Sequence, residues 1–375
     1  MHDNFESSFI NICNENLLKT ESLFVSQKEQ WLSDFEKHFI SICTEIVRLQ
    51  NEANLAAISY IEYTMLYTNF ISRNYKAEVW VYGDDHYCDK CQCMVGEYDI
   101  SFLFSYFDEL WESLISERKR YINKVSAKDV VECMLRALPS FYSYLASIVR
   151  FAIIDCIDEK PFTNIVKNDM FELNVGDYMA KTKPVYTLNR SREAATLVKQ
   201  FMGRMSQNTF EDCSELDFSG CSFKNMKFLC VQFRNSILNN VKFNSSVLLG
   251  SSFYGAQMEN SSLYYCAING VTFSYAQLKN ADFKYASGNP GLPKPGKWWH
   301  AGHLPVNFCN ADLTNADFYC ASLKGADFRN ATLTGANFAE AVLDNAIFST
   351  RALPLSEEQM SKIIIDQDSS TLLCK

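Results

Sequence analysis

The sequence has little of what most enzyme active sites are built from. It contains only 5 histidines, and two of them, His300 and His303, lie in one segment, so histidine-based catalysis has little to build on. It also has no Gly-rich phosphate loop, no nucleophile elbow and no set of Ser, His and Asp typical of a catalytic triad. The sequence therefore predicts a protein that is not an enzyme and that needs no cofactor.

Signals for secretion or membrane insertion are also missing. Residues 1–9 are polar and acidic, unlike the basic and then apolar start of a signal peptide. The longest nearly apolar run, 142–157, contains Arg150 and Asp155 and is too short to span a bilayer. The 14 cysteines form no paired framework, which favours a reduced compartment. We expect a cytoplasmic protein that does not interact with membranes.

The negative charge is unevenly distributed along the chain. Residues 1–213 hold 31 acidic and 22 basic side chains, a net charge of −9. Residues 214–350 hold 9 acidic and 10 basic side chains, a net charge of +1, and the remaining 25 residues have a net charge of −1. The C-terminal half is therefore close to neutral, which argues against direct binding to nucleic acid.

A five-residue repeat runs through this neutral half. Apolar residues occur at every fifth position from Phe218 to Phe283 and again from Phe308 to Phe348, and 13 of these 23 central residues are Phe. The residue two positions after the centre is Asn or Gly in 15 of the 23 units, and both accept the conformations that a corner requires. A period of five fits neither a helix nor a strand, so it indicates a coil that turns a corner in each unit.

This pattern resembles the pentapeptide-repeat family, whose consensus is A-(D/N)-L-X-X. Ala316-Asp317-Phe318 and Ala326-Asp327-Phe328 match it directly. The resemblance implies a right-handed quadrilateral β-helix with four units per coil and about six coils. The capping box Ser356-x-x-Gln359 predicts a short helix that closes the last coil, a tail similar to that of many bacterial members of the family.

Residues 1–205 are expected to form a mainly α-helical domain, which makes the whole chain α+β. A capping box at Ser26-x-x-Glu29 is followed by an apolar stripe from Trp31 to Leu49 that is typical of a long helix. Further helices are expected over 103–122, 130–157 (bent near Pro139) and 192–205, and a strand over 77–82. The expected domains are thus 1–205, a β-helix over 206–350 with an inserted loop at 287–306, and a cap over 351–375.

One segment has the residue types of a metal site. It contains His86, Cys88, Cys91 and Cys93, and a Cys-x2-Cys pair begins many zinc sites. Because no second cysteine pair follows at zinc-finger spacing, we expect a loop with free thiols and no bound metal.

Two further features suggest a partner-binding site. The inserted loop is rich in Gly and Pro and carries Lys297, Trp298, Trp299 and His300, so its tryptophans either pack on the fold or contact a partner. Tyr265 and Tyr285 are 20 residues apart, which is one coil, so they should stack on the outside. Tyr275 lies two faces away and should not join them.

Three functions are compatible with these observations. The first is a non-enzymatic scaffold that binds a protein partner. The second follows from the family resemblance, since some members bind DNA gyrase and protect it from quinolones; a DNA mimic, however, needs an ordered negative surface, which a net charge of +1 does not supply. The third is an enzyme or ligand-binding activity in the N-terminal domain.

Overall fold

A computed structural model describes residues 2–53, 55–84, 92–121, 124–178, 182–203, 208–290, 304–349, 353 and 355–366. These residues form two compact units, one made mainly of residues before Asn189 and one of residues from Asn189 onward. The boundary expected near residue 205 therefore lies earlier, because the helix before it packs with the solenoid core.

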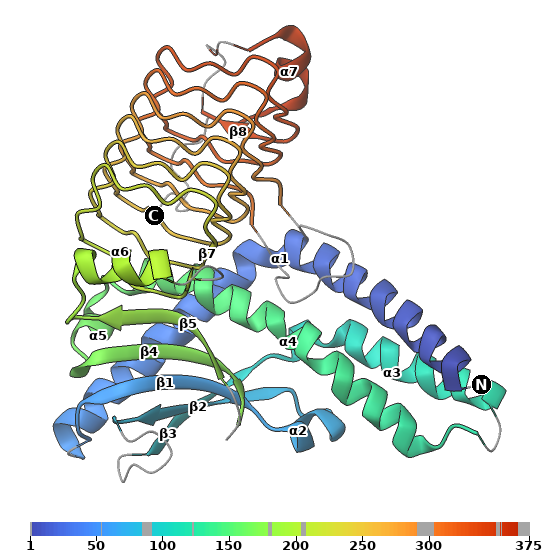
Figure 1. Ribbon diagram of the computed structural model, residues 1–375. Helices are drawn as coiled ribbons and strands as arrows, with labels where there is room; N and C mark the ends of the chain where they lie inside the picture. Colours follow the sequence, from blue (N-terminus) through green and yellow to red (C-terminus); the bar gives the residue numbers. More distant parts are fainter. Residues whose placement is uncertain are drawn as a thin grey trace. The chain divides into compact units, whose positions relative to one another are not determined.

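The N-terminal unit combines helices with a five-stranded sheet in the order β3-β2-β1-β4-β5 (Figure 1). β1 pairs antiparallel with β2 and parallel with β4. Its helices are α1 (His2–Glu52), α2 (Tyr67–Ile71), α3 (Ser105–Arg118), α4 (Ala127–Cys156) and α5 (Lys160–Thr163), with short 3-10 turns at Ser101–Leu103 and Lys119–Tyr121. Its strands are β1 (Ile58–Met65), β2 (Lys76–Tyr82), β3 (Cys93–Asp99), β4 (Lys167–Asp177) and β5 (Thr182–Asn189).

Aromatic side chains fix the helices to the sheet. Phe35 of α1 contacts Tyr63 of β1 with 5.3 Å between ring centroids, and Phe39 contacts Phe162 of α5 at 5.8 Å. The face of α1 that contains Trp31, Phe35 and Phe39 is buried, as its apolar spacing predicts.

The helical expectation for this unit is confirmed but incomplete. α3, α4 and β2 lie where the sequence placed them, whereas the other four strands of the sheet were not anticipated. The N-cap assigned to Ser26 is wrong: α1 is continuous from His2, and the Ser26 hydroxyl donates a hydrogen bond to the carbonyl of Leu23 within the helix. α4 is long and apolar enough to cross a membrane by composition, but 61% of its most apolar window is buried inside the structure.

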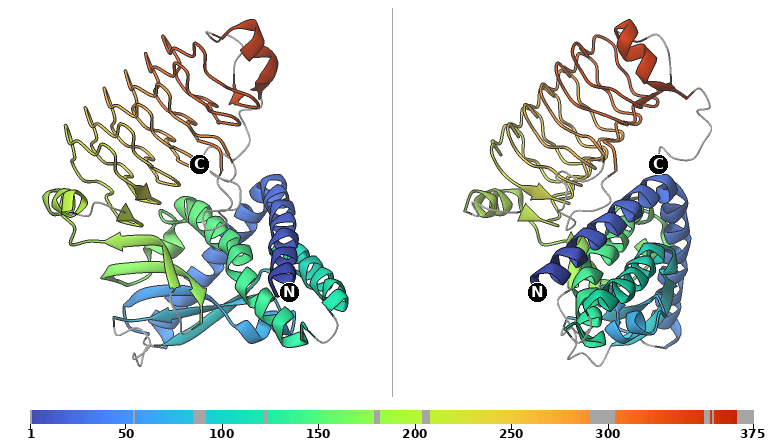
Figure 2. Two further views of the ribbon diagram at one scale, coloured as in Figure 1. Left: turned by 45° about the vertical axis from the view of Figure 1, so that its right-hand side comes forward. Right: turned by 90° about the vertical axis from the view of Figure 1, so that its right-hand side faces the viewer.

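The C-terminal unit is a stack of coils with a register of twenty residues (Figure 2). Parallel bridges join Asp217 to Ile237 and Ile237 to Gln257, so each coil contains four pentapeptides. Regular strands are short here: β6 (Asn208–Thr209) pairs with β7 (Phe228–Leu229), and β8 (Ile347–Phe348) pairs with β9 (Ile364–Ile365). The coarse expectation of a β-helix in this region is confirmed.

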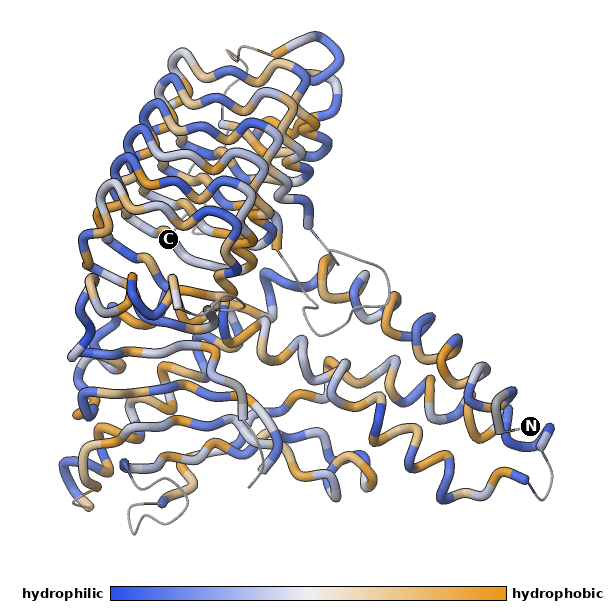
Figure 3. Tube along the Cα trace, in the orientation of Figure 1, coloured by the Kyte–Doolittle hydropathy of each residue, from blue (hydrophilic) through white to orange (hydrophobic). Residues whose placement is uncertain are grey.

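The centres of the pentapeptides form a continuous apolar core, and hydrophobic and hydrophilic positions alternate around each coil (Figure 3). Phe308, Phe328 and Phe348 stack on one another with centroid spacings of 4.9 and 4.8 Å. Phe283, Phe318 and Phe338 stack in the same way, both at 4.9 Å. Successive coils therefore rise by about 4.8 Å, the spacing of hydrogen-bonded strands.

Helices close both ends of this core. At one end, Phe201 of α6 (Ala194–Gly203) contacts Phe223 and Phe228 at 5.9 and 5.3 Å. At the other end, α7 (Glu357–Lys362) begins with the predicted capping box of Ser356 and Gln359. The Gln359 side-chain amide also donates to the carbonyls of Phe338 and Ala341, both at 2.8 Å. It thereby satisfies backbone groups that the last coil would otherwise leave unpaired.

A buried ion pair secures the start of the solenoid. The Arg192 guanidinium lies 3.2 Å from the carboxylate of Asp212, and both side chains are largely buried. Arg192 also donates to the carbonyl of Ser214 at 2.7 Å. Burial raises the pKa of Asp212, and the nearby guanidinium opposes that rise.

Candidate functional site

Three of the exposed tyrosines of the solenoid, together with the partly buried Tyr264, gather at one corner of successive coils. We call this group the tyrosine surface and define it as Tyr264, Tyr265, Tyr285 and Tyr319. Tyr265 and Tyr285 stack at 5.3 Å with an interplanar angle of 23°. Tyr285 also meets Tyr264 edge-on at 5.6 Å and Tyr319 at 5.8 Å. The predicted stacking of Tyr265 on Tyr285 is therefore confirmed, and two further rings extend the cluster.

Three of these four rings are exposed to solvent although they contact one another, and Tyr264 is partly buried. Tyr265 is 60% exposed, Tyr285 38% and Tyr319 36%. Exposed large apolar groups that cluster, as opposed to occurring singly, mark interaction surfaces. Tyrosine suits such a surface because its ring supplies contact area while its hydroxyl supplies a hydrogen bond.

The backbone at this corner is unfavourable for tyrosine. Tyr265 and Tyr285 each have a φ of 59°, in the left-handed region. Most other corners of the solenoid place Asn or Gly at this position, and these tolerate a positive φ. A bulky residue there costs about 1–2 kcal/mol, so local backbone preference does not explain the tyrosines.

The ion-paired side chains beside the tyrosine surface are one lysine and two aspartates. Lys284 precedes Tyr285, and its ammonium lies 3.8 Å from Asp282 and 3.6 Å from Asp317. Contact with the Cys320 thiol raises the pKa of Tyr319 further above neutral pH, where a tyrosine hydroxyl is protonated in any case. The corner thus presents neutral aromatic rings and hydroxyl donors beside three ion-paired side chains with a net charge of −1.

A second tyrosine pair is separate from this group. Tyr275 is 40% exposed with a φ of 60°, and it contacts Tyr254 at 5.2 Å. The Arg234 guanidinium lies 4.7 Å from the centre of the Tyr254 ring. Each coil has four pentapeptides, and the pentapeptides centred on residues 253 and 273 are two units away from those centred on 263 and 283. This second pair therefore occupies a different face, as the sequence predicted for Tyr275.

The inserted loop leaves and rejoins the solenoid at a defined place. Bridges join Thr272 to Asn307 and Asp282 to Asp317, a spacing of 35 residues instead of 20, so the insertion adds 15 residues to one coil. The side chain of Asn289 accepts hydrogen bonds from the Ser322 hydroxyl and the Lys324 amide at 3.0 and 3.1 Å. The point of departure is therefore fixed one corner beyond Tyr285.

The loop residues proposed for partner binding, Lys297, Trp298, Trp299 and His300, lie outside the described residues. The same is true of His86, Cys88 and Cys91 in the candidate metal segment. Cys93 is described, and its thiol approaches the carbonyl of Met94 at 3.6 Å. Within the described ranges, no group of three or more His, Cys, Asp or Glu side chains is arranged to hold a metal ion.

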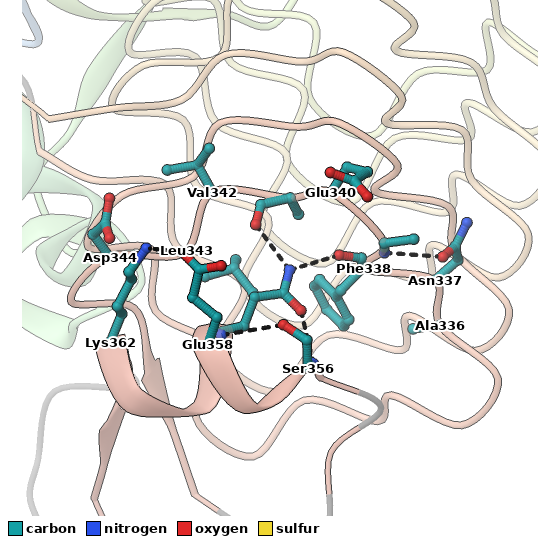
Figure 4. A pocket seen from close by; sticks show the side chains of 13 residues that line it. Ala336, Asn337, Phe338, Glu340, Val342, Leu343, Asp344, Ser356, Glu358 and Lys362 are labelled. Carbon is teal, nitrogen blue, oxygen red and sulfur yellow. Dashed lines mark hydrogen bonds and ion pairs between the residues drawn. The ribbon is translucent and has the colours of Figure 1, made fainter.

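A cavity of about 670 Å³ lies beside the C-terminal cap (Figure 4). It lies between the last coil and α7, and its charged lining consists of Glu340, Asp344, Glu358 and Lys362. Lys362 is paired with Glu358 at 2.7 Å. The amide of Gln359, which crosses this space, is occupied by backbone carbonyls. These polar groups thus close the end of the coil, which is a structural role.

Among the described residues of the N-terminal unit, one carboxylate is fully buried. Glu62 of β1 lies on the strand face opposite the helix-facing Tyr63, and it accepts hydrogen bonds from Asn174 at 3.1 Å and Thr182 at 3.0 Å. Its neighbour across the sheet is Trp80. Because Asn174 of β4 and Thr182 of β5 both donate to the carboxylate, it connects three strands of the sheet in a polar network.

Sequence reasoning missed Tyr264 and Tyr319. Tyr264 adjoins Tyr265 and could have been included from the sequence alone. Tyr319 could not, because its position depends on how many residues the insertion adds to one coil. The spacing of 35 residues places Tyr319 beside Tyr285.

The family model for pentapeptide repeats matches eight copies in residues 227–263, 306–330 and 321–349. No curated protein matches the chain. The C-terminal region is therefore a pentapeptide-repeat domain, in agreement with the sequence pattern.

Several solved structures are similar to this region. A pentapeptide repeat protein from the Arabidopsis thaliana thylakoid lumen is 23% identical, over 39% of this chain and 73% of that one, with a TM-score of 0.18. A pentapeptide repeat protein from Nostoc PCC 7120 is 17% identical, over 46% and 96%, with a TM-score of 0.23. QnrB1, a plasmid-mediated fluoroquinolone resistance protein, is 17% identical, over 38% and 85%, with a TM-score of 0.14. Matches of this quality carry no argument about function.

Proposed function

We propose that this protein is a non-enzymatic scaffold whose right-handed solenoid presents the tyrosine surface to a partner protein. The observation that supports this proposal is the cluster of four tyrosine rings, in which the exposed Tyr265 and Tyr285 occupy corner positions with a positive φ. Asn or Gly would be easier to accommodate there. Clustered aromatic residues of this kind often dominate the binding energy of protein interfaces.

Affinity capture tests this proposal. The full chain is immobilised and incubated with native cell extract, alongside the variant Tyr265→Asn/Tyr285→Asn and the control Tyr275→Asn. The control residue has the same backbone conformation and comparable exposure but occupies another face. We expect a protein that is retained by the wild type and by Tyr275→Asn and is lost from the double variant. Equal retention by all three forms would remove the tyrosine surface from the proposal.

The inserted loop provides a second arm of the same experiment. Replacing Gly291–Leu304 with a short Gly-Ser link keeps Asn289, which is hydrogen-bonded to the neighbouring coil. Such loops tolerate changes in length better than cores do. If the loop carries part of the recognition through Trp298 and Trp299, as we predict from the sequence, this variant should also lose the captured protein.

Binding to a topoisomerase remains a narrower alternative. It requires an ordered negative surface that resembles DNA, whereas the solenoid region has a net charge of +1 and the charges around the tyrosine surface are paired. The geometry therefore favours a partner with a neutral contact surface.

A further inference from the structure

The spacing of the tyrosines along the solenoid suggests what kind of segment they bind. Tyr264 and Tyr319 occupy equivalent positions two coils apart, with Lys284 at the equivalent position between them. Stacked Phe rings in the core give a rise of 4.8 to 4.9 Å per coil. The repeat distance between these two tyrosines along the axis is therefore about 9.7 Å, twice the strand spacing.

This distance matches one regular peptide conformation better than the others. A polyproline II helix has three residues per turn and rises 3.1 Å per residue, so side chains at i and i+3 repeat every ~9.3 Å on one side. An α-helix has a pitch of 5.4 Å, so two of its turns are longer than the rise of two coils by about 1 Å. A β-strand repeats every ~6.6 Å on one face and matches neither one coil nor two.

The chemistry of the surface agrees with that geometry. Proline-rich segments in this conformation bind exposed aromatic rings, and tyrosine hydroxyls can donate to their free carbonyls. Lys284 is ion-paired with Asp282 and Asp317, and the net charge of −1 of these three side chains does not oppose an uncharged ligand. A phosphate-bearing ligand would find no free cation in this cluster of described side chains.

We propose that the tyrosine surface binds a proline-rich segment of the partner, in the polyproline II conformation and running along the solenoid axis. Prolines three residues apart pack against Tyr264 and Tyr319, while Tyr265 and Tyr285 form the wall beside them. This inference rests on the proposed scaffold function and specifies the chemistry of its partner.

The test uses the full chain and a fluorescently labelled peptide of ten prolines, with fluorescence anisotropy as the readout. A Gly-Ser peptide of equal length and a single-stranded oligonucleotide of ten nucleotides serve as comparison ligands. We expect saturable binding of the proline peptide at least tenfold tighter than that of either comparison ligand. Because proline side chains carry no charge, the affinity should change less than twofold between 50 and 500 mM salt.

Variants assign the binding to the surface. Tyr265→Asn/Tyr285→Asn should weaken the proline peptide at least tenfold, whereas Tyr275→Asn should leave it within twofold of the wild type. Circular dichroism of both variants checks that the fold is retained. Equal binding of all three ligands, tighter binding of the oligonucleotide, or equal effects of the two variants would each overturn the inference.

The outcome also separates this inference from the proposed function. If the proline peptide does not bind but a captured protein still depends on Tyr265 and Tyr285, the surface is a docking site for another kind of segment and only the inference fails. If neither the peptide nor any captured protein depends on these residues, both fail.

Discussion

Replacing Gly288 with alanine should disturb the place where the inserted loop rejoins the solenoid. Gly288 stands at the centre of the unit after Phe283. A Cβ atom on Gly288 would lie 2.2 Å from the Val306 Cγ2 atom, and 3.1 and 3.2 Å from Ile268 and Leu323. The side chain of Val306 therefore fills the space that Gly288 leaves empty in the core.

The size of the effect follows from this exchange of volume. Overpacking by one methyl group costs about 1–3 kcal/mol in a core that cannot relax. Val306→Ala alone removes two buried methyl groups and should cost about 2–3 kcal/mol, including the cavity. In the double variant Gly288→Ala/Val306→Ala, the new Cβ atom occupies part of the space that the valine methyl groups leave. The loss of stability in the double variant should therefore be smaller than the sum of the two single losses by at least about 1 kcal/mol.

Native-state hydrogen exchange of the amides in 264–290 and 304–325 measures these differences within the solenoid itself. Gly203→Ala is the matched control, because a Cβ atom there meets nothing within 4 Å, and it should change stability by less than about 0.5 kcal/mol. Additive losses in the double variant, or no loss in Gly288→Ala, would show that Val306 does not fill this space.

Three further predictions test other parts of the account. Phe318→Asp should abolish the solenoid's thermal transition, because even a neutral polar group without a hydrogen bond costs about 2–7 kcal/mol in an apolar core and an unpaired charge costs more. Lys324→Ala, which loses one exposed ion pair, should cost under about 1 kcal/mol, and equal melting curves for the two variants would refute the register. Tyr265→Asn should change the melting temperature by less than a few degrees, because relief of about 1 kcal/mol of backbone strain offsets lost ring contacts of similar size; a large loss would make this tyrosine structural. Burial lowers the pKa of His38 to about 4, so as the pH falls the unfolded chain takes up a proton at this histidine before the folded chain does. The free energy of unfolding should therefore decrease between about pH 6.5 and pH 4, by at most about 3 kcal/mol before solvent screening. A pH-stability profile that His38→Phe leaves unchanged would contradict this.

The solenoid could be predicted from the sequence because its determinants are local. Each pentapeptide carries its own inward centre and its own corner residue, and the register of twenty residues follows from four such units. The repeat does not predict how many residues the insertion adds to its coil. Phe308 lies a multiple of five residues after Phe283, and this spacing is compatible with several different paths of the chain between them. The structure shows that Gly288 takes the place of one more centre before the chain leaves.

The N-terminal sheet could not be predicted in the same way. β1 is buried on both faces and so lacks the alternation that marks a half-exposed strand. Its parallel neighbour β4 lies more than one hundred residues further along the chain, and no local pattern reports such a pairing. At Ser26, the capping-box pattern lies inside a helix because aromatic packing continues on both sides, from Phe24 to Trp31.

The candidate site was partly visible in the sequence. The twenty-residue spacing of Tyr265 and Tyr285 predicted their stacking, since it equals one coil. The positive φ at both positions, together with the cluster of four rings, gives this pair its functional interest. That observation needed the structure, because a tyrosine at a corner position is not by itself evidence of strain.

Site-specific photo-crosslinking tests the central claim, that the tyrosine surface contacts a partner protein, most directly. A photoreactive phenylalanine analogue is introduced at position 265 in one form of the full chain and at position 275 in another, and both are irradiated in the native cell. Because both positions are exposed corners with the same backbone conformation, they differ mainly in the face they occupy. The account predicts a discrete adduct with one protein from position 265 and none from position 275. Adducts of equal yield from both positions, or none from position 265, would contradict it.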